Sequence, residues 1–165
     1  MKKMNSQVKS FNTAIARSKP SAPLMKILSS YFKVSDDMTS YKFLDYGCGR
    51  GFDSDFLIKK GFNVDSYDPY WRPKTLKSGS YDYIFCTYVL NVLEEEDSIA
   101  TVNNIRSLLK NGGIAFLSVR RDIKKDGETS RGFQRNVILD LDKLCDYKNR
   151  YCIYLLRGNN ERRIR

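Results

Sequence analysis

Leu44-Asp45-Tyr46-Gly47-Cys48-Gly49-Arg50-Gly51 is the stretch around which the chain is organised. The apolar run 41–44 that leads into it is typical of a β-strand, and residues 52–61 follow as a helix that ends at a glycine. The alternating glycines remove every Cβ from one side of the turn, so a ligand can approach the backbone and the free N–H groups of the helix start. A strand, a glycine-rich turn and a helix in this order predict the nucleotide-facing corner of a doubly wound α/β domain.

The spacing of the glycines separates two kinds of nucleotide site. It reads G-x-G-x-G, and Phe52 stands where the dinucleotide fingerprint needs its third glycine, which argues against NAD or FAD. Asp68 ends the next predicted strand, 62–67, and lies 17 residues after Gly51. A carboxylate in that position accepts hydrogen bonds from both ribose hydroxyls. The alternative is a turn that only reverses the chain, with Asp68 as an ordinary loop acid, but the two features in register favour a nucleotide site.

Composition limits the class of protein. A chain of 165 residues with 41% hydrophobic residues is expected to form one globular domain. No apolar run approaches the roughly 18 residues of a membrane span, and the N-terminus has no apolar signal core, so we expect a cytoplasmic protein. The chain has no histidine, which excludes Ser-His-Asp and Cys-His machinery and any His-ligated metal, and we expect no metal site. The four cysteines form no C-x-x-C pair and are interpreted as reduced structural thiols: Cys48, Cys86, Cys145 and Cys152.

The net charge of +10 is concentrated in the two ends of the chain. Residues 1–33 hold seven Lys/Arg and no acid, and residues 148–165 hold six Lys/Arg and one acid. We expect a basic, loosely ordered arm over 1–19, a domain over 20–157 and a basic tail over 158–165. The charged ends are either arms for RNA or DNA or tails that confer solubility, and the pattern does not choose between them.

Periodicity predicts the remaining elements. A helix from Pro23 to Phe32 is expected to pack on the sheet, and strand 81–88 leads to a helix that starts at the acids 94–97 and stops at 111–113. The apolar face of that helix is expected to contain Ile99, Val102, Ile105, Leu108 and Leu109. Strand 114–119 follows, then a polar loop over 123–132 that could act as a lid. Two final strands, 136–141 and 151–156, are expected to pair antiparallel.

The interval between Asp68 and Tyr81 is short. Only 12 residues intervene, with Pro69, Pro73 and Gly79 among them, so no long helix fits. We interpret Tyr70 or Trp71 as an aromatic that contacts an adenine. Equally, Trp71 could cover an exposed sheet edge.

These motifs, in this order, resemble the class I S-adenosylmethionine-dependent methyltransferases. Residues 44–51 resemble the first motif, and Leu108 to Gly113 resemble the LKPGG turn, with Asn111 in place of proline. The resemblance implies a three-layer Rossmann-like fold with a mostly parallel sheet and antiparallel C-terminal strands. The short interval after Asp68 implies a shortened version that lacks the third strand and its flanking helices. More narrowly, residues 45–51, 67–70 and 88–92 look like a compact bacterial and phage group that includes methyltransferases associated with DNA phosphorothioation.

The resemblance implies S-adenosylmethionine as the cofactor and assigns residues to it. The first motif would surround the methionine end, Asp68 would bind the ribose, Asp53 could reach the ammonium, and Thr87 and Tyr88 would close over the centre. The predicted cofactor contacts are Asp45, Gly47, Cys48, Gly49, Gly51, Asp53, Asp68, Pro69, Tyr70, Thr87 and Tyr88. The acceptor is expected above the carboxyl ends of strands 81–88 and 114–119. The predicted catalytic residues there are Tyr88, Asn91, Arg120 and Asp122, and Arg121 is a further candidate for binding an anion.

The acceptor itself is open. Residues 87–91 contain neither the Pro-Pro motif of exocyclic-amine DNA methyltransferases nor the Pro-Cys nucleophile of cytosine C5 enzymes. Three functions therefore remain. The chain is a methyltransferase for a small molecule, a methyltransferase for nucleic acid or protein that uses its basic ends, or a non-catalytic cofactor-binding module that acts with a partner.

Overall fold

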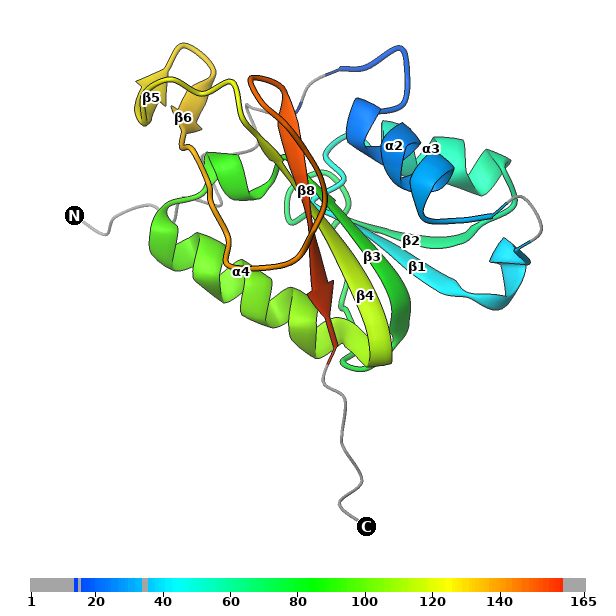
Figure 1. Cartoon of the computed structure of the whole chain (residues 1–165). Helices are drawn as coiled ribbons and strands as arrows, with labels where there is room; N and C mark the ends of the chain where they lie inside the picture. Colours follow the sequence, from blue (N-terminus) through cyan, green and yellow to red (C-terminus); the bar gives the residue numbers. More distant parts are fainter. Residues whose placement is uncertain (1–13, 15, 34–35, 159–165) are drawn as a thin grey trace.

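The computed structural model describes residues 14, 16–33 and 36–158. A six-stranded sheet in the order β2-β1-β3-β4-β8-β7 forms the centre of the molecule (Figure 1). The first four strands in this order are parallel, and β8 and β7 are antiparallel. The strands are β1 (Lys42–Tyr46), β2 (Asn63–Tyr67), β3 (Tyr81–Thr87), β4 (Leu109–Arg120), β7 (Lys143–Tyr147) and β8 (Tyr151–Arg157). A separate hairpin consists of β5 (Gly127–Thr129) and β6 (Gly132–Gln134).

Helices cover both faces of the sheet. α2 (Ala22–Ser30) and α3 (Phe52–Lys59) lie on one face, and α4 (Glu95–Leu108) lies on the other (Figure 1). The side chain of Ser21 caps α2 by accepting a hydrogen bond from the N–H of Leu24. α4 begins with three acidic residues in its first turn, where the helix dipole favours negative charge. The described residues also contain two short 3-10 helices, η2 (Met38–Ser40) and η3 (Leu90–Val92).

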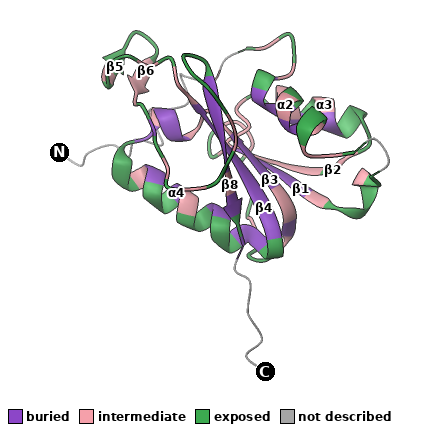
Figure 2. Cartoon of the chain, in the orientation of Figure 1, coloured by how far each residue is buried: buried purple, intermediate pink, exposed green. Residues whose placement is uncertain are grey.

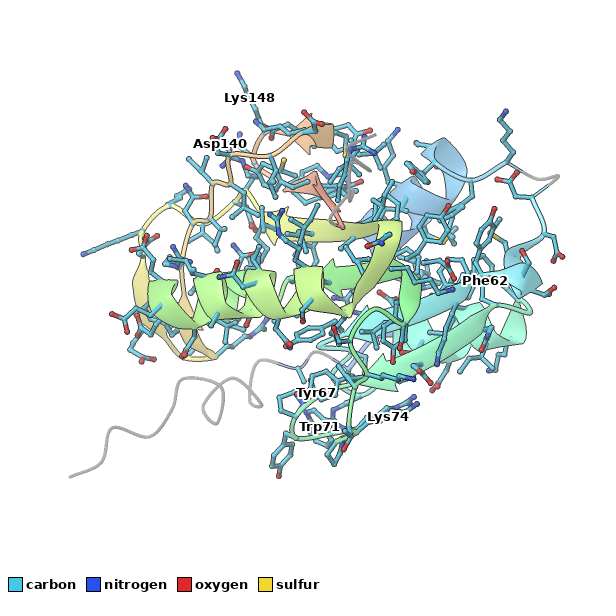
Figure 3. All side chains as sticks on the ribbon, turned by 90° about the horizontal axis from the view of Figure 1, so that it is seen from below. Phe62, Tyr67, Trp71, Lys74, Asp140 and Lys148 are labelled. Carbon is cyan, nitrogen blue, oxygen red and sulfur yellow. The ribbon has the colours of Figure 1, made fainter. Side chains whose placement is uncertain are left out.

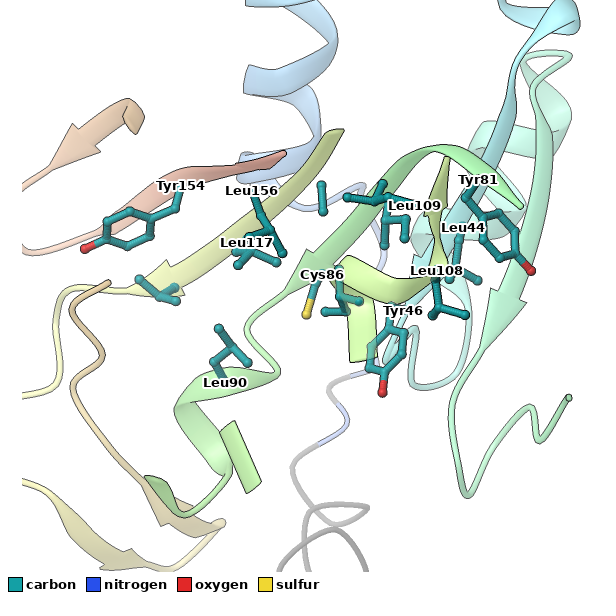
Figure 4. Close-up of a cluster of buried hydrophobic side chains, with 14 of the residues drawn as sticks. Leu44, Tyr46, Tyr81, Cys86, Leu90, Leu108, Leu109, Leu117, Tyr154 and Leu156 are labelled. Atoms are coloured by element: carbon teal, nitrogen blue, oxygen red, sulfur yellow. The ribbon is translucent and has the colours of Figure 1, made fainter. Parts of the chain in front are cut away.

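The core is divided into two layers because neighbouring strand residues point to opposite faces. Leu44 and Tyr46 of β1 pack with Cys86 of β3 and with α4, and Figure 4 shows this cluster. Phe43 points the other way, toward α2 and α3, in a second cluster where the rings of Phe43, Phe85 and Phe116 stack across three strands at centroid distances of 5.9 and 5.8 Å. The central strands are accordingly the buried part of the molecule in Figure 2.

The predicted shortening of the sheet is confirmed within the described residues. β2 is the edge strand, and the chain between β2 and β3 forms neither a helix nor a further strand. Residues 68–72 fold back in a tight loop, in which the backbones of Asp68 and Arg72 exchange two hydrogen bonds of 3.1 Å. Figure 3 shows Trp71 on this loop and Lys74 just after it, and Lys74 forms an ion pair with Asp65 of β2. The mixed sheet with an antiparallel end is the predicted fold class.

One predicted strand is wrong. Residues 136–141 form no strand, and the partner of β8 is β7, which begins two residues after that run ends. Val137 is buried and Leu139 and Leu141 pack against the core, but Ile138 is 70% exposed, so the apolar residues are buried from an extended coil. β7 is an edge strand with Lys143 and Asp146 paired on it, and charge of this kind is how edge strands avoid further pairing.

Two predicted boundaries and one helix position also differ. α4 ends at Leu108, and β4 already begins at Leu109, before the glycines that were expected to stop the helix. Ile99 was expected on the apolar face of this helix but is 57% exposed. The residues of α4 that are buried against the sheet are Ser98, Thr101, Ile105 and Leu108. The polar loop 123–132 contains β5 and the first residue of β6.

Two further expectations concern the state of the cysteines and the presence of a membrane span. All four cysteines are free thiols, as predicted. Of the helices in the described part of the chain, none has the length and apolar character that a membrane span requires.

Candidate functional site

A pocket of about 330 Å³ lies at the carboxyl ends of the parallel strands. Its wall combines the segment before α2, the glycine loop, the end of β2, the ends of β3 and β4, and the hairpin strand β6. Among the lining residues are Ala14, Ala16, Arg17, Asp45, Gly47, Cys48, Gly49, Gly51, Asp53, Asp68, Pro69, Tyr70, Thr87, Tyr88, Arg120 and Gln134. The structure therefore gathers every predicted cofactor residue around one cavity.

The glycine loop follows β1 and turns directly into α3. Gly47, Gly49 and Gly51 have φ values of +72°, +54° and +85°, a left-handed conformation that other residues rarely adopt. The N–H groups of Gly47 and Cys48 donate to the carbonyl of Tyr67 at 2.7 and 2.9 Å, which fixes the loop to the end of β2. A Cβ on Gly47 would lie 2.3 Å from Val89, so the loop has no room for a side chain there.

Asp68 is held rigidly beside this loop. One carboxylate oxygen accepts hydrogen bonds from the N–H groups of Tyr70 and Trp71, both at 2.9 Å, and the other accepts from Gly49 at 3.1 Å. Three backbone donors orient the carboxylate and leave acceptor capacity on its oxygens. It stands at the carboxyl end of β2, where the sequence predicts a ribose-binding acid.

Arg72 connects the tight loop to the glycine loop and was not predicted as a site residue. Its guanidinium binds both carboxylate oxygens of Asp55 at 3.0 Å and also donates to the carbonyl of Arg50 at 3.1 Å. A Cβ on Gly51 would lie 2.0 Å from the guanidinium carbon. No motif marks Arg72. The only signal in the sequence was that the short interval after Asp68 had to fold back on itself.

Asp45 and Asp53 place two carboxyl groups at the α3 end of the pocket. Asp45 is only 4% exposed and accepts a 2.6 Å hydrogen bond from the hydroxyl of Ser54. Burial, with a smaller contribution from the nearby charge of Asp53, raises the pKa of Asp45 to about 7, although the hydrogen bond from Ser54 acts in the opposite direction. Asp53 is not simply solvated, since its carboxylate accepts a 2.8 Å hydrogen bond from the N–H of Ser21.

Tyr88 occupies the end of β3 with a strained backbone. Its φ of +63° is uncommon for a residue other than glycine, and its N–H donates to the carbonyl of Ser118 at 2.8 Å. The guanidinium of Arg17 lies over its ring, 5.7 Å from the centroid. Burial raises the pKa of Tyr88 to about 12, so the phenol stays protonated at neutral pH. Burial also raises the pKa of Cys48 to about 12, which leaves that side chain a thiol.

The predicted catalytic residues of β4 and η3 are divided between the pocket and the core. Arg120 lines the pocket and forms a bidentate pair with Asp122 at 2.9 and 2.7 Å, while Asp122 itself lies outside the wall. Asn91 is fully buried and does not reach the pocket. Its amide donates to the carbonyl of Arg135 at 2.8 Å and accepts from the N–H of Arg120 at 2.7 Å. The Asn91 side chain therefore holds the backbones of Arg120 and Arg135 together and does not line the pocket, and its predicted catalytic role stays a prediction.

The remaining candidates lie around the pocket. Arg121 pairs with Asp146 at 3.5 Å and does not line the cavity. Of the two aromatic residues after Asp68, Tyr70 lines the pocket, whereas Trp71 packs under the guanidinium of Arg50 at 4.5 Å from the ring centroid. Contact of either ring with an adenine stays a prediction.

Comparisons with known proteins agree with this geometry. The family described as a methyltransferase domain matches residues 12–150. A Pyrococcus horikoshii OT3 protein, PH0226, superposes with a TM-score of 0.57 at 14% identity, over 83% of this chain and 88% of that one. The 1,6-didemethyltoxoflavin-N1-methyltransferase of Burkholderia thailandensis, solved with 1,6-didemethyltoxoflavin and S-adenosylhomocysteine, gives a TM-score of 0.55 at 15% identity, over 88% and 94%.

A third structure, from work on the conversion of a disulfide bond into a thioacetal group in echinomycin biosynthesis, gives a TM-score of 0.51 at 15% identity. It covers 62% of this chain, which spans about half of that one (52%). At these identities the superpositions show the fold. The comparison with curated proteins gives no match.

Proposed function

The chain belongs to the methyltransferase domain family, and from this premise we propose that its acceptor is a small molecule bound at the carboxyl ends of β3 and β4. The domain is S-adenosylmethionine-dependent. When bound, the cofactor supplies an electrophilic methyl carbon. The tasks of the protein are to orient the two reactants, to exclude water and, where the acceptor needs it, to take up a proton.

The residues of the pocket fit this cofactor. The glycine loop forms a cradle that a Cβ would fill, and Asp68 presents a fixed carboxylate beside it. We assign Asp68 and Pro69 with Tyr70 to the nucleoside. The methionine end is assigned to Gly47, Cys48, Gly49 and Gly51 together with the carboxyl groups of Asp45 and Asp53. Thr87 and Tyr88 then lie at the reacting centre.

The observation that carries the small-molecule acceptor is the continuity of the pocket. One cavity runs from Asp68 at the end of β2 to Arg120 at the end of β4, and Gln134 of the hairpin strand β6 belongs to its wall. Gln134 lies 3.5 Å from the guanidinium of Arg120, so the hairpin and β4 close that side together. A pocket of about 330 Å³ that β4 and the hairpin bound at its acceptor end suits a compact molecule better than a nucleic-acid duplex.

The chemistry of the wall limits the acceptor atom. Tyr88 is protonated at neutral pH, and the pairing of Asp122 with Arg120 holds the pKa of that carboxyl below its usual range. Neither group is a strong base, and the chain has no histidine. We therefore assign the enzyme an acceptor that is nucleophilic without strong-base assistance, such as a thiolate or an unprotonated amine nitrogen. Tyr88 can donate a hydrogen bond that orients it.

The proposal also covers the narrower family, the cellular compartment, the start of the domain and the basic ends. The narrower resemblance places the chain in the compact bacterial and phage group associated with DNA phosphorothioation. The free cysteines favour a reducing compartment, the cytoplasm. Because Ala14, Ala16 and Arg17 line the pocket, the domain begins before residue 20, within the segment expected to be an arm. The basic ends at 1–13 and 159–165 lie outside the described residues, and contact of these ends with RNA or DNA is a second, untested possibility.

The test is transfer of labelled methyl from S-adenosylmethionine into a cell extract, followed by separation with nuclease, protease and size filtration. A Gly49→Asp variant places a carboxylate in the pocket beside Ala14, whereas Gly79→Asp makes the same change at a similar φ of +62° with nothing within 4 Å. We expect label in the small-molecule fraction with the wild-type chain and Gly79→Asp, and none with Gly49→Asp. Label in nucleic acid would reject the small-molecule acceptor. Cofactor binding without any transfer would favour a binding module.

A further inference from the structure

Gln134 is a polar side chain of the pocket wall that no motif of the sequence marks. It ends the hairpin strand β6, is half-buried and lines the cavity together with Arg120. Its side-chain oxygen accepts a hydrogen bond from Nη1 of Arg120 at 3.5 Å. Because a guanidinium only donates, this contact assigns the oxygen of the amide to Arg120 and leaves its NH2 group for another partner. Within the described residues, that NH2 group donates no hydrogen bond.

Arg120 has its charge balanced before any ligand arrives. Its Nε and Nη2 donate to the two carboxylate oxygens of Asp122 at 2.9 and 2.7 Å, and Asp122 lies outside the pocket wall. Asp122 and Gln134 use only part of the N–H donors of this guanidinium. An anion at this point would compete with Asp122, whereas a neutral oxygen accepts from the remaining donors and leaves the ion pair intact.

The two side chains start from backbones that Asn91 ties together. The side-chain oxygen of Asn91 accepts from the N–H of Arg120 at 2.7 Å, and its NH2 group donates to the carbonyl of Arg135 at 2.8 Å. The N–H of Arg135 donates in turn to the carbonyl of Asn91 at 2.7 Å. Arg135 directly follows Gln134, so both donors of the wall are anchored at or next to this buried amide. Donors that are held in place before binding lose little freedom when a ligand arrives.

Tyr88 adds a further donor at the same end of the cavity. Its phenol stays protonated at neutral pH, and the charges of Arg120 and Asp122 act on its ionisation, which places it near the pair. Tyr88, Arg120 and Gln134 therefore offer O–H and N–H groups to a ligand. A ligand that fits these groups presents acceptor atoms to them.

We infer that Gln134 and Arg120 form a subsite for a neutral carbonyl oxygen of the methyl acceptor, of the amide, lactam or ketone kind. This inference rests on the proposed function, because it names the chemistry of the molecule that the domain methylates. A carbonyl oxygen has two lone pairs, so it accepts from the NH2 group of Gln134 and from an N–H of Arg120 together.

The test observes Gln134 directly. The chain has two glutamines, Gln7 and Gln134, so side-chain 15N labelling of glutamine gives two NH2 signals in an NMR spectrum, and Gln134→Glu identifies the one that belongs to Gln134. The full chain is first saturated with S-adenosylhomocysteine, which calorimetry verifies. Acetophenone, benzoate and aniline are then titrated as probes. They share one ring and carry a neutral carbonyl, a carboxylate and a hydrogen-bond donor.

We expect acetophenone to shift the NH2 signals of Gln134 and to bind about 3- to 10-fold tighter than aniline, the range for a neutral hydrogen bond. Benzoate should bind no tighter than acetophenone. Gln134→Glu replaces the donor with a carboxylate, so aniline should then bind tighter than acetophenone. The NMR signals of the probes themselves give these dissociation constants in every variant.

Asn136→Asp is the matched control, because it makes the same change from amide to carboxylate at an exposed position that does not line the pocket. It should leave the order of the probes unchanged. Asp122→Asn leaves the charge of Arg120 unbalanced, and it should shift the preference toward benzoate by about 3- to 10-fold.

Two results would overturn the inference while the proposed function stands. Tighter binding of benzoate than of acetophenone by the wild-type chain would give this end of the pocket to an anionic acceptor. NH2 signals of Gln134 that do not respond to acetophenone, or an order of probes that Gln134→Glu leaves unchanged, would remove Gln134 from the acceptor site. If S-adenosylhomocysteine does not bind, the proposed function itself fails, and this shows before any probe is added.

Discussion

Asp45 is a carboxyl group whose burial opposes its ionisation. An unfolded chain loses this proton near pH 4, whereas the folded chain keeps it until about pH 7. Between these values the folded state binds more protons than the unfolded state, so the contribution of Asp45 to the free energy of unfolding falls as the pH rises from about 4 to about 7. The group therefore costs stability at neutral pH, and its retention in the pocket wall points to a use for its negative charge.

The first prediction follows from that charge. A cationic ligand beside Asp45 favours the ionised form, so binding of S-adenosylmethionine should release a proton near pH 6.5. Affinity should rise about 3- to 10-fold between pH 6 and 8, and Asp45→Asn should bind more weakly and with little pH dependence. Calorimetry in two buffers of different ionisation enthalpy measures the proton directly. Identical heats in both buffers would show that Asp45 does not titrate on binding.

The second prediction concerns Gly51 and uses Gly61 as its control. Both have φ near +85°, at opposite ends of α3, but a Cβ on Gly61 meets nothing within 4 Å whereas one on Gly51 meets the guanidinium of Arg72. Each alanine should cost about 1 kcal/mol of backbone strain. Because the guanidinium can move, Gly51→Ala should lower the free energy of unfolding by only about 1 kcal/mol more than Gly61→Ala does, through loss of the Arg72–Asp55 pair. Gly51→Ala should also weaken cofactor binding at least tenfold.

Denaturant unfolding and calorimetry of the two variants check this difference. In an Arg72→Ala background the two glycine substitutions should cost the same, because the clash is absent. A difference that persists without Arg72 would place the cause in the loop backbone alone.

At the level of elements, Asn91 joins three segments that meet beside the acceptor end. It sits in η3, its amide binds the backbones of β4 at Arg120 and of the hairpin strand's end at Arg135, and its own carbonyl accepts from the N–H of Arg135 at 2.7 Å. Asn91→Ala leaves two backbone groups without their partners, and we expect a loss of about 2–4 kcal/mol of unfolding free energy. Asn104→Ala is the control, because Asn104 is exposed and its side chain makes only one hydrogen bond within the described residues, of 3.1 Å to the hydroxyl of Tyr46. It should lower the free energy of unfolding by less than about 1 kcal/mol.

An activity measurement distinguishes a role of Asn91 in positioning Arg120 from a role in stability alone. If Asn91 holds Arg120 in place, the Asn91→Ala chain should keep its cofactor affinity below its unfolding temperature while the KM for the acceptor rises. Equal stability of the Asn91→Ala and Asn104→Ala chains would show that η3 is not held to β4 and the hairpin through this amide.

The same elements show what the sequence could and could not predict. The glycine loop, Asp68 and strands β1 to β4 were predictable because glycine spacing and apolar runs are local signals. β7 was not, because an edge strand needs few apolar residues, and the apolar run before it is buried as coil. The pairing of Arg72 with Asp55 and the position of Arg17 over the ring of Tyr88 depend on contacts between distant residues, and no local pattern specifies them.

At the scale of the whole molecule, the role of the net charge can be tested by removing the two basic ends. Of the +10, residues 1–13 supply +3 through three lysines, and residues 159–165 supply +2 through three arginines and one glutamate. The domain between them must be kept intact in any truncation. Ala14 lines the pocket, and the N–H of Gly158 donates to the carbonyl of Gly113 at 2.9 Å. A chain of residues 14–158 is thus the truncation that removes half of the charge and keeps every described residue that lines the site.

This truncation distinguishes the effect of the basic ends on nucleic-acid binding from their effect on methyl transfer. Binding of mixed RNA or DNA should weaken, and the slope of log affinity against log salt should decrease by about 3 to 4, because the number of counterions released follows the number of phosphates that the protein neutralises. Affinity for S-adenosylmethionine should stay within about twofold, and so should transfer to the small-molecule fraction, since the described residues that line the pocket all remain. Fluorescence anisotropy across a salt series measures the first effect, and labelled transfer the second. If transfer falls together with nucleic-acid binding, the ends deliver the acceptor, which would then be the nucleic acid and not a molecule enclosed between β4 and the hairpin.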